Sequence, residues 1–134
     1  MEVSITVDDA AVRAMLTRTP ERIDRAMTAA MHDATTYLLR QIRPYPAPPA
    51  GSKYIRTGTL AKSWHIPPFE GSGADLVGRV QSSGQTAPYN RWVQDRTRQA
   101  RVHQGRWQTA QTVAERSTRA INDMFANRIS AALG

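Results

Sequence analysis

A long apolar stripe that stops at a run of prolines is the feature that most constrains the fold of this chain. The stripe consists of Ile23, Met27, Ala30, Met31, Ala34, Leu38 and Ile42. Its steps of three and four residues are the spacing of one face of an α-helix. Thr19 and Pro20 provide a capping hydroxyl and a first-turn proline, whereas the segment PYPAPPAG from Pro44 cannot continue a helix. We therefore predict a helix of about six turns from Pro20 to Arg43, followed by an extended, exposed spacer.

The helical period returns near residue 108 and continues to the end of the sequence. The apolar positions there are Val113, Ala114, Ile121, Met124, Phe125, Ile129, Ala132 and Leu133. They form one broad face, which predicts a second long helix that packs on a sheet beside the first. Thr112 and Glu115 have the spacing of a capping box, if this helix begins late. Three arginines fall mostly off the apolar face, namely Arg116, Arg119 and Arg128.

Three segments have the composition of β-strands. Val3–Val7 alternates apolar with polar residues and is rich in β-branched side chains. Lys62–Ile66 and Leu76–Ser82 lie on either side of a glycine-rich turn, so we expect them to pair as an antiparallel hairpin. Gly78 lies inside the second of these strands, where it allows a bulge or a closely packed neighbour.

Together these elements predict an α+β fold, with two long helices packed on a small antiparallel β-sheet and an extended exposed loop. We expect three or four strands, and a short helix from Asp8 to about Thr17. At 134 residues, the length suits one domain spanning 1–134. The sequence has no apolar run of about 20 residues and no basic and apolar leader at its start, so we expect a soluble protein that is made in the cytoplasm.

The stretch Tyr54–Ser63, reading YIRTGTLAKS, lies where the predicted fold changes from helix to sheet. Gly58 follows Thr57 at the expected chain reversal, because a residue without Cβ takes positive φ at little cost. An ordinary connection between a loop and a strand explains the same residues. The positions that define this turn motif are Arg56, Thr57, Gly58, Leu60 and Ser63.

The charge of the chain is strongly positive. Lysine and arginine number 18 against 11 acidic residues, which gives a formal net charge of +7, and lysine occurs only at positions 53 and 62. Arginine makes forked contacts with carboxylates and phosphates, so this bias fits a protein interface or a nucleic-acid surface. Cysteine is absent, which excludes disulfides and thiolate chemistry.

The densest basic segment is also rich in tryptophan. Pro88–Gln94 has the character of a further strand or a short helix, and residues 95–107 have the character of an exposed loop or arm. The candidate residues for a subunit interface or a DNA channel are Arg91, Trp92, Arg96, Arg98, Arg101, Arg106 and Trp107. Three interpretations remain open: phosphate contacts with stacking indoles, a subunit interface, or a solvated loop whose tryptophans close the core. We favour the interface, because no recognisable nucleic-acid-binding motif accompanies the charge.

Catalytic and metal-binding patterns are missing from the sequence. His32, His65 and His103 have no metal-ligand spacing, and the sequence contains no GxSxG, HExxH or P-loop motif. We therefore predict a protein that is not an enzyme, with no catalytic residues, no bound metal and no cofactor.

The order of these features resembles the neck and tail-completion proteins, also called head–tail joining proteins, of long-tailed bacteriophages. The resemblance rests on the long first helix, the proline-rich break, the turn motif, a Gly78-x-Val80 strand, Pro88-Tyr89 before Trp92-Val93, and a final helix. It spans roughly the whole chain through short motifs. It implies a virion structural protein with an α+β fold, which forms a homo-oligomeric ring around the DNA channel at the head–tail junction or tail terminus.

Further expectations follow from this resemblance. The partners would be adjacent connector, head-closure or tail proteins, with non-specific contact to genomic DNA in the channel and none to a membrane. The protein would be in the host cytoplasm during assembly and in the virion afterwards. The alternative, which rests on charge alone, is a small non-specific DNA-binding protein.

Overall fold

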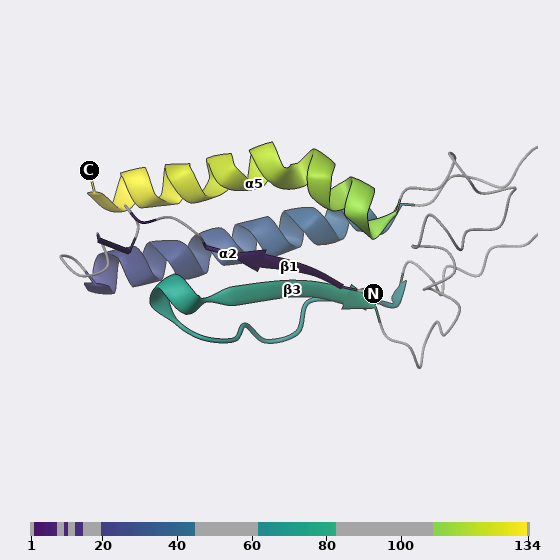
Figure 1. The fold of residues 1–134 in the computed structure, drawn as a ribbon, viewed down its shortest axis with the longest axis horizontal. Helices are drawn as coiled ribbons and strands as arrows, with labels where there is room; N and C mark the ends of the chain where they lie inside the picture. Colours follow the sequence, from purple (N-terminus) through teal and green to yellow (C-terminus); the bar gives the residue numbers. More distant parts are fainter. Residues whose placement is uncertain are drawn as a thin grey trace, which may run out of the picture.

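The computed structural model of the chain describes residues 2–7, 10, 13–14, 20–44, 62–82 and 109–133 (Figure 1). The elements in chain order are β1 (Glu2–Thr6), α2 (Pro20–Ile42), β2 (Trp64–His65), η1 (Gly73–Asp75), β3 (Val77–Ser82) and α5 (Ala110–Leu133). Two helices lie on a three-stranded antiparallel sheet, so the predicted α+β architecture is confirmed.

The sheet has the order β1-β3-β2, with both pairings antiparallel. The predicted hairpin is therefore correct, although β2 has only two residues. In the pairing of β1 with β3, Glu2 lies opposite Gln81 and Thr6 opposite Val77. Because strand side chains alternate between faces, Val3 and Ile5 face the helices, where they pack on the core.

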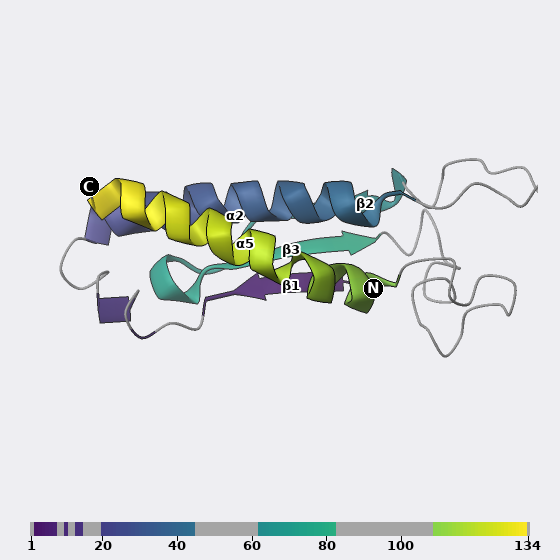
Figure 2. The ribbon, with the colours of Figure 1, turned by 90° about the horizontal axis from the view of Figure 1, so that it is seen from above.

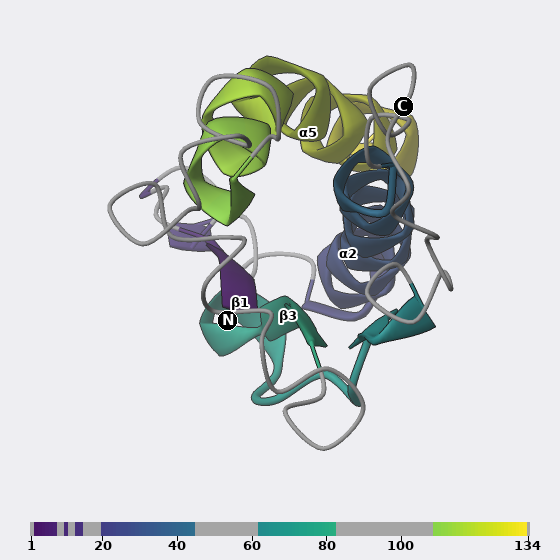
Figure 3. The same cartoon turned by 90° about the vertical axis from the view of Figure 1, so that its right-hand side faces the viewer.

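The two helices run antiparallel to each other along one side of the sheet (Figure 1). Viewed along the molecule, α2 lies over the sheet and α5 lies beside α2 and over β1 (Figure 3). The prediction that α5 packs on the sheet beside α2 is confirmed: α5 lies over β1, reaches Trp64 and Val80 through Ala110 and Val113, and packs most extensively on α2. Helix α2 starts at Pro20 as expected, and every member of its predicted stripe is buried.

The core consists of two clusters at opposite ends of the helix pair. The first is built around the fully buried Trp64 and contains Leu38, Ile42, Val80, Ala110 and Val113. The second contains Ile23, Met27 and Ile129, with Phe125 and Val7 packed against them. Apolar burial of this kind is the main term that stabilises a small domain.

Glycines serve two different purposes in the sheet region. Gly78 lies in the middle of β3 and faces α2 so closely that a Cβ there would collide with Met31. Of the two possibilities that the sequence allowed at Gly78, the structure shows the closely packed neighbour. It shows no bulge, because the pairing of β3 with β1 continues without a break through this residue. Gly71 and Gly73 take positive φ angles of 73° and 58° in the turn before β3, where glycine has no steric penalty.

The start of α5 corrects one sequence prediction. The helix begins at Ala110, and the hydroxyl of Thr109 accepts a hydrogen bond from the Thr112 backbone N–H at 3.2 Å. Thr109 is therefore the N-cap, and the Thr112/Glu115 capping box is wrong because Thr112 already lies inside the first turn. At the other end of α5, Leu133 is 49% exposed and does not join the core.

Some predicted elements fall mainly outside the described residues. In the short helix expected from Asp8 to Thr17, only Ala10, Arg13 and Ala14 are described, and they are helical. The proline-rich spacer after Pro44 and the strand or helix at 88–94 lie outside the described part. Within that part, neither long helix has the sustained apolar length that a membrane span requires.

Candidate functional site

The structure describes one of the predicted site residues, Ser63. Its side chain is buried, with 2% exposure, directly before Trp64 at the start of β2. The remaining predicted residues lie outside the described ranges, so the structure does not test whether they come together. They are Arg56, Thr57, Gly58, Leu60, Arg91, Trp92, Arg96, Arg98, Arg101, Arg106 and Trp107.

The described residues that flank both segments lie together at one end of the fold. Ile42 precedes the segment with the turn motif, and Trp64 follows it; both belong to one buried cluster. Ser82 precedes the arginine-rich segment and pairs with Trp64, whereas Ala110 follows that segment and packs in the same cluster. We call this the Trp64 end; Figures 1 and 2 show the end of α2, the start of α5 and β2 together there.

A hydrogen bond closes the base of the first segment. Arg43, directly after α2, donates from Nη2 to the Trp64 carbonyl oxygen at 3.3 Å. The Trp64 indole is fully buried between the ends of α2 and α5, which fixes the carbonyl that receives this bond. A charged donor strengthens such a contact. The two ends of segment 44–63 are therefore held in one place on the body.

The positive charge is concentrated away from the described body. The described ranges contain ten of the 18 basic residues and eight of the 11 acidic residues. They carry a formal charge of only +2, and the remaining +5 belongs to the rest of the chain. An attraction to polyanions would therefore depend mainly on the two segments whose described flanks meet at the Trp64 end.

Ion pairs neutralise part of the charge on the described surface. Arg79, on the outer face of the sheet, lies 2.8 Å from Glu70 and 3.9 Å from Glu2. The hydrogen bond that Arg79 donates to the Glu70 carboxylate raises the pKa of Arg79 above its ordinary value. A second pair joins the helices, with Arg128 Nε 2.8 Å from Asp33 Oδ2.

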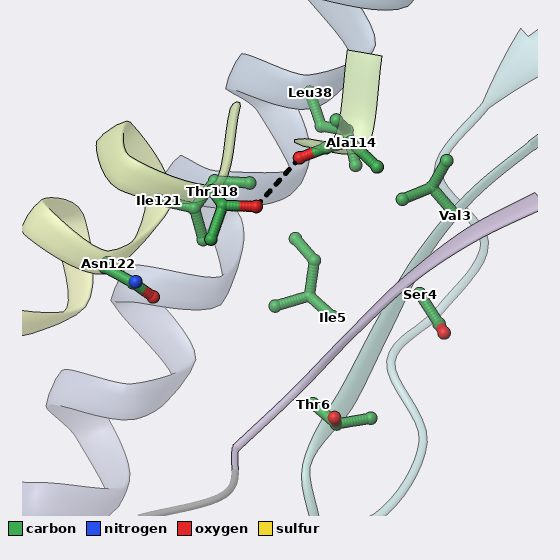
Figure 4. Close-up of a pocket in the computed structure, with 9 residues that line it drawn as sticks. All are labelled: Val3, Ser4, Ile5, Thr6, Leu38, Ala114, Thr118, Ile121 and Asn122. Carbon is green, nitrogen blue, oxygen red and sulfur yellow. Dashed lines mark hydrogen bonds between the residues drawn. The ribbon is translucent and has the colours of Figure 1, made fainter. Parts of the chain in front are cut away.

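A shallow groove runs between β1 and α5 (Figure 4). Its volume is about 240 Å³, and its lining residues are Val3, Ser4, Ile5, Thr6, Leu38, Ala114, Thr118, Ile121 and Asn122. Figure 4 shows Ile5 on the helix side of β1, with Ser4 and Thr6 on the other side. None of the lining residues is charged. This composition suits an uncharged, extended polypeptide better than a nucleic acid.

The two described histidines lie apart and have different neighbours. The His32 ring packs against Phe69, with centroids 4.8 Å apart. His65 lies on the other side of the sheet, with Nδ1 3.2 Å from the Ser63 carbonyl oxygen and Nε2 3.4 Å from Gln81 Nε2. In the ranges that the structure describes, no three His, Asp or Glu side chains converge on a possible metal position.

Comparison with known proteins gives no relative. The chain matches no protein-family model, and no curated protein or solved structure is significantly similar to it.

The groove beside β1 is not evident from the sequence patterns. The residues of α5 that line it, such as Thr118 and Asn122, are polar and lie next to the apolar face rather than on it. Only the sheet order, which places β1 at an edge, brings them next to Val3 and Ile5. The one signal in the sequence was the complete lack of charge in Val3–Val7.

Proposed function

We propose that this chain is a structural subunit of the neck of a long-tailed bacteriophage, which assembles into a ring around the DNA channel and joins head to tail. The observation that carries the proposal is the order of features along the sequence, with the turn motif between the proline-rich break and the first hairpin strand. The arrangement of two helices on a small antiparallel sheet is compatible with that role.

The anchoring of both candidate segments at one end gives the proposal a physical form. In a ring, the arginine-rich segment of each subunit would contact its neighbour or the passing DNA, while the globular body supplies a rigid support. Because the body is nearly neutral, the positive field of the ring would come from these segments. The subunit would act by surface contact, without making or breaking bonds.

Imaging of assembled particles tests this proposal directly. We expect the purified protein, mixed with tailless heads or free tails of the phage that encodes it, to add a ring at the junction that electron microscopy resolves. Particles assembled without the protein should lack the ring and fail to join. If the protein stays unbound in the presence of both structures, the proposal is wrong.

A second function has support from the distribution of charge. With +5 of the +7 net charge outside the described body, the chain would also suit a small non-specific DNA-binding protein. That function predicts tight binding of duplex DNA by the isolated protein. The logarithm of the association constant should then fall linearly with the logarithm of the salt concentration. A neck subunit should bind free DNA weakly but bind tailless heads or free tails strongly. The DNA-binding measurement and the particle imaging therefore distinguish the two functions.

A further inference from the structure

The two edges of the sheet are protected to very different extents. At one edge, β2 is only two residues long and is followed by Pro67 and Pro68, which cannot donate to a further strand. At the other edge, β1 has five residues, and among the described residues only β3 pairs with it. Natural proteins shield exposed edges with charge, proline or short length, because unpaired N–H and C=O groups attract other strands.

Strand β1 has few of these protective features. Its one charged residue, Glu2, lies at the start of the strand, and the four residues that follow, Val3–Thr6, contain no charge, no proline and no glycine. The groove beside it continues this uncharged surface onto α5, through Ile121 and Thr118. A strand added to β1 would lie about 4.8 Å further out and would place every second side chain in this groove.

We propose that β1 pairs with β1 of a second copy of this chain, antiparallel, around a twofold axis at Ser4. The helix-facing side chains of the second copy's β1 then lie in the groove. In this register Val3 lies opposite Ile5 of the second copy, and Glu2 lies opposite Thr6. The two three-stranded sheets join into one sheet of six strands, with α5 from each copy on the same face.

The charge pattern of the strand favours a second copy as the occupant. Glu2 is the single charged residue of β1. In the register centred on Ser4, each Glu2 faces a neutral threonine, and the two carboxylates lie at opposite ends of the pairing. Cross-strand pairs of β-branched residues such as Val3 and Ile5 stabilise antiparallel sheets, whereas like charges placed opposite each other destabilise them. Each subunit contributes the same surface to the contact, as in most homodimers.

This inference does not depend on the proposed phage function. It describes the free protein, which would be a dimer of 14.9 kDa chains before any larger assembly forms. A dimer without ring assembly would refute the proposed function alone, and ring assembly from a monomer would refute the pairing alone.

A single engineered cysteine tests the pairing and its register, because the natural chain has none. In Ser4→Cys, the two cysteines would face each other across the axis with Cα atoms about 4.5–5.5 Å apart, within disulfide range. In Thr6→Cys, on the same strand and the same face, they would be about 13 Å apart along the strands. His65→Cys places an exposed thiol on the same face at the opposite edge of the sheet.

On mild oxidation we expect Ser4→Cys to form a covalent dimer on a non-reducing gel at least about tenfold faster than the two other variants. Equal rates for Ser4→Cys and Thr6→Cys would mean parallel pairing or random collision, and fastest cross-linking of His65→Cys would mean pairing through β2. Either result overturns the proposal. No cross-linking of any variant would mean that another part of the same chain covers the edge, which also overturns it.

Sedimentation measurements supply a second test without cross-linking. Ser4 lies opposite Arg79 within the single chain, so Ser4→Asp should fold normally. In the dimer, however, the two introduced carboxylates would lie opposite each other. We therefore expect the dissociation constant of the dimer to rise about three- to fivefold. His65→Asp, an equal charge change on the same face, should leave the dimer constant unchanged. A wild-type protein that stays monomeric at every concentration would overturn the proposal.

Discussion

Met31 of α2 occupies the space that a side chain at Gly78 of β3 would need. An ideal Cβ on Gly78 would lie 2.6 Å from Met31 Sδ and 2.9 Å from Thr35 Cγ2. Met31 is fully buried, and the Thr35 hydroxyl donates to the Met31 carbonyl oxygen at 2.8 Å. The helix and the sheet are therefore in contact at the backbone of β3, which sets their separation.

We expect Gly78→Ala to lower the free energy of unfolding by about 1–3 kcal/mol, because the new methyl group would overlap two fully buried side chains. Urea unfolding followed by circular dichroism measures the change. The double variant Gly78→Ala with Met31→Ala should lose less stability than the sum of the single variants, since removal of the sulfur makes room for the new methyl group. Strict additivity would contradict this packing.

The hydroxyl of Ser117 is an unsatisfied polar group inside the helix pair. Ser117 is fully buried, and its Oγ has no hydrogen-bond partner in the part of the chain that the structure describes. We expect Ser117→Ala to raise the free energy of unfolding by about 1 kcal/mol, because a buried hydroxyl without a partner is destabilising. Ser130→Ala, an exposed position on the same helix, controls for helix propensity. Destabilisation by Ser117→Ala would show that the hydroxyl has a partner after all.

The N-cap of α5 provides a third test, at the Trp64 end. Thr109 is 4% exposed and accepts the Thr112 N–H, so Thr109→Ala should reduce the free energy of unfolding by about 0.5–2 kcal/mol. Thr109→Ser keeps the hydroxyl and should retain most of the stability. Thr28→Ala removes an exposed hydroxyl that donates to the Asp24 carbonyl oxygen within its own helix, and thermal unfolding should show little change for it.

The arginine-rich segment can be separated from net charge by two matched triple variants. Arg96→Ala, Arg98→Ala and Arg101→Ala together lower the formal charge from +7 to +4. The same change follows from alanine at Arg22, Arg25 and Arg119, which are exposed on the two helices. We expect the first set to abolish ring assembly in electron micrographs and the second to leave it intact. Equal loss in both sets would mean that charge alone governs the interaction.

Local patterns predicted most of the elements in this fold. Pro20 and Pro44 mark the ends of α2 so clearly that the observed helix differs from the predicted one by a single residue. The start of α5 has two possible caps in the sequence, because Thr109 and Thr112 both offer a hydroxyl. The burial of Ala110 and Val113 against Trp64, a contact distant in sequence, selects the earlier start.

The sequence patterns did not predict which elements distant along the chain contact each other. An apolar face on α5 indicates that the helix is buried on one side, but not that its main neighbour is α2. Likewise, the alternation in Val3–Val7 predicted a strand without showing that it lies at the edge of the sheet. The groove depends on both facts, so its residues were found only in the structure. The arginine-rich segment and most of the turn motif lie outside the described residues and stay predictions.

The direction of α5 offers a way to see how each subunit is oriented in a larger assembly. Its 24 residues carry the chain about 36 Å from Ala110 to Leu133, away from the base of both candidate segments (Figure 2). A gold-labelled tag fused after this helix would therefore report, in images of a larger assembly, which way each subunit points.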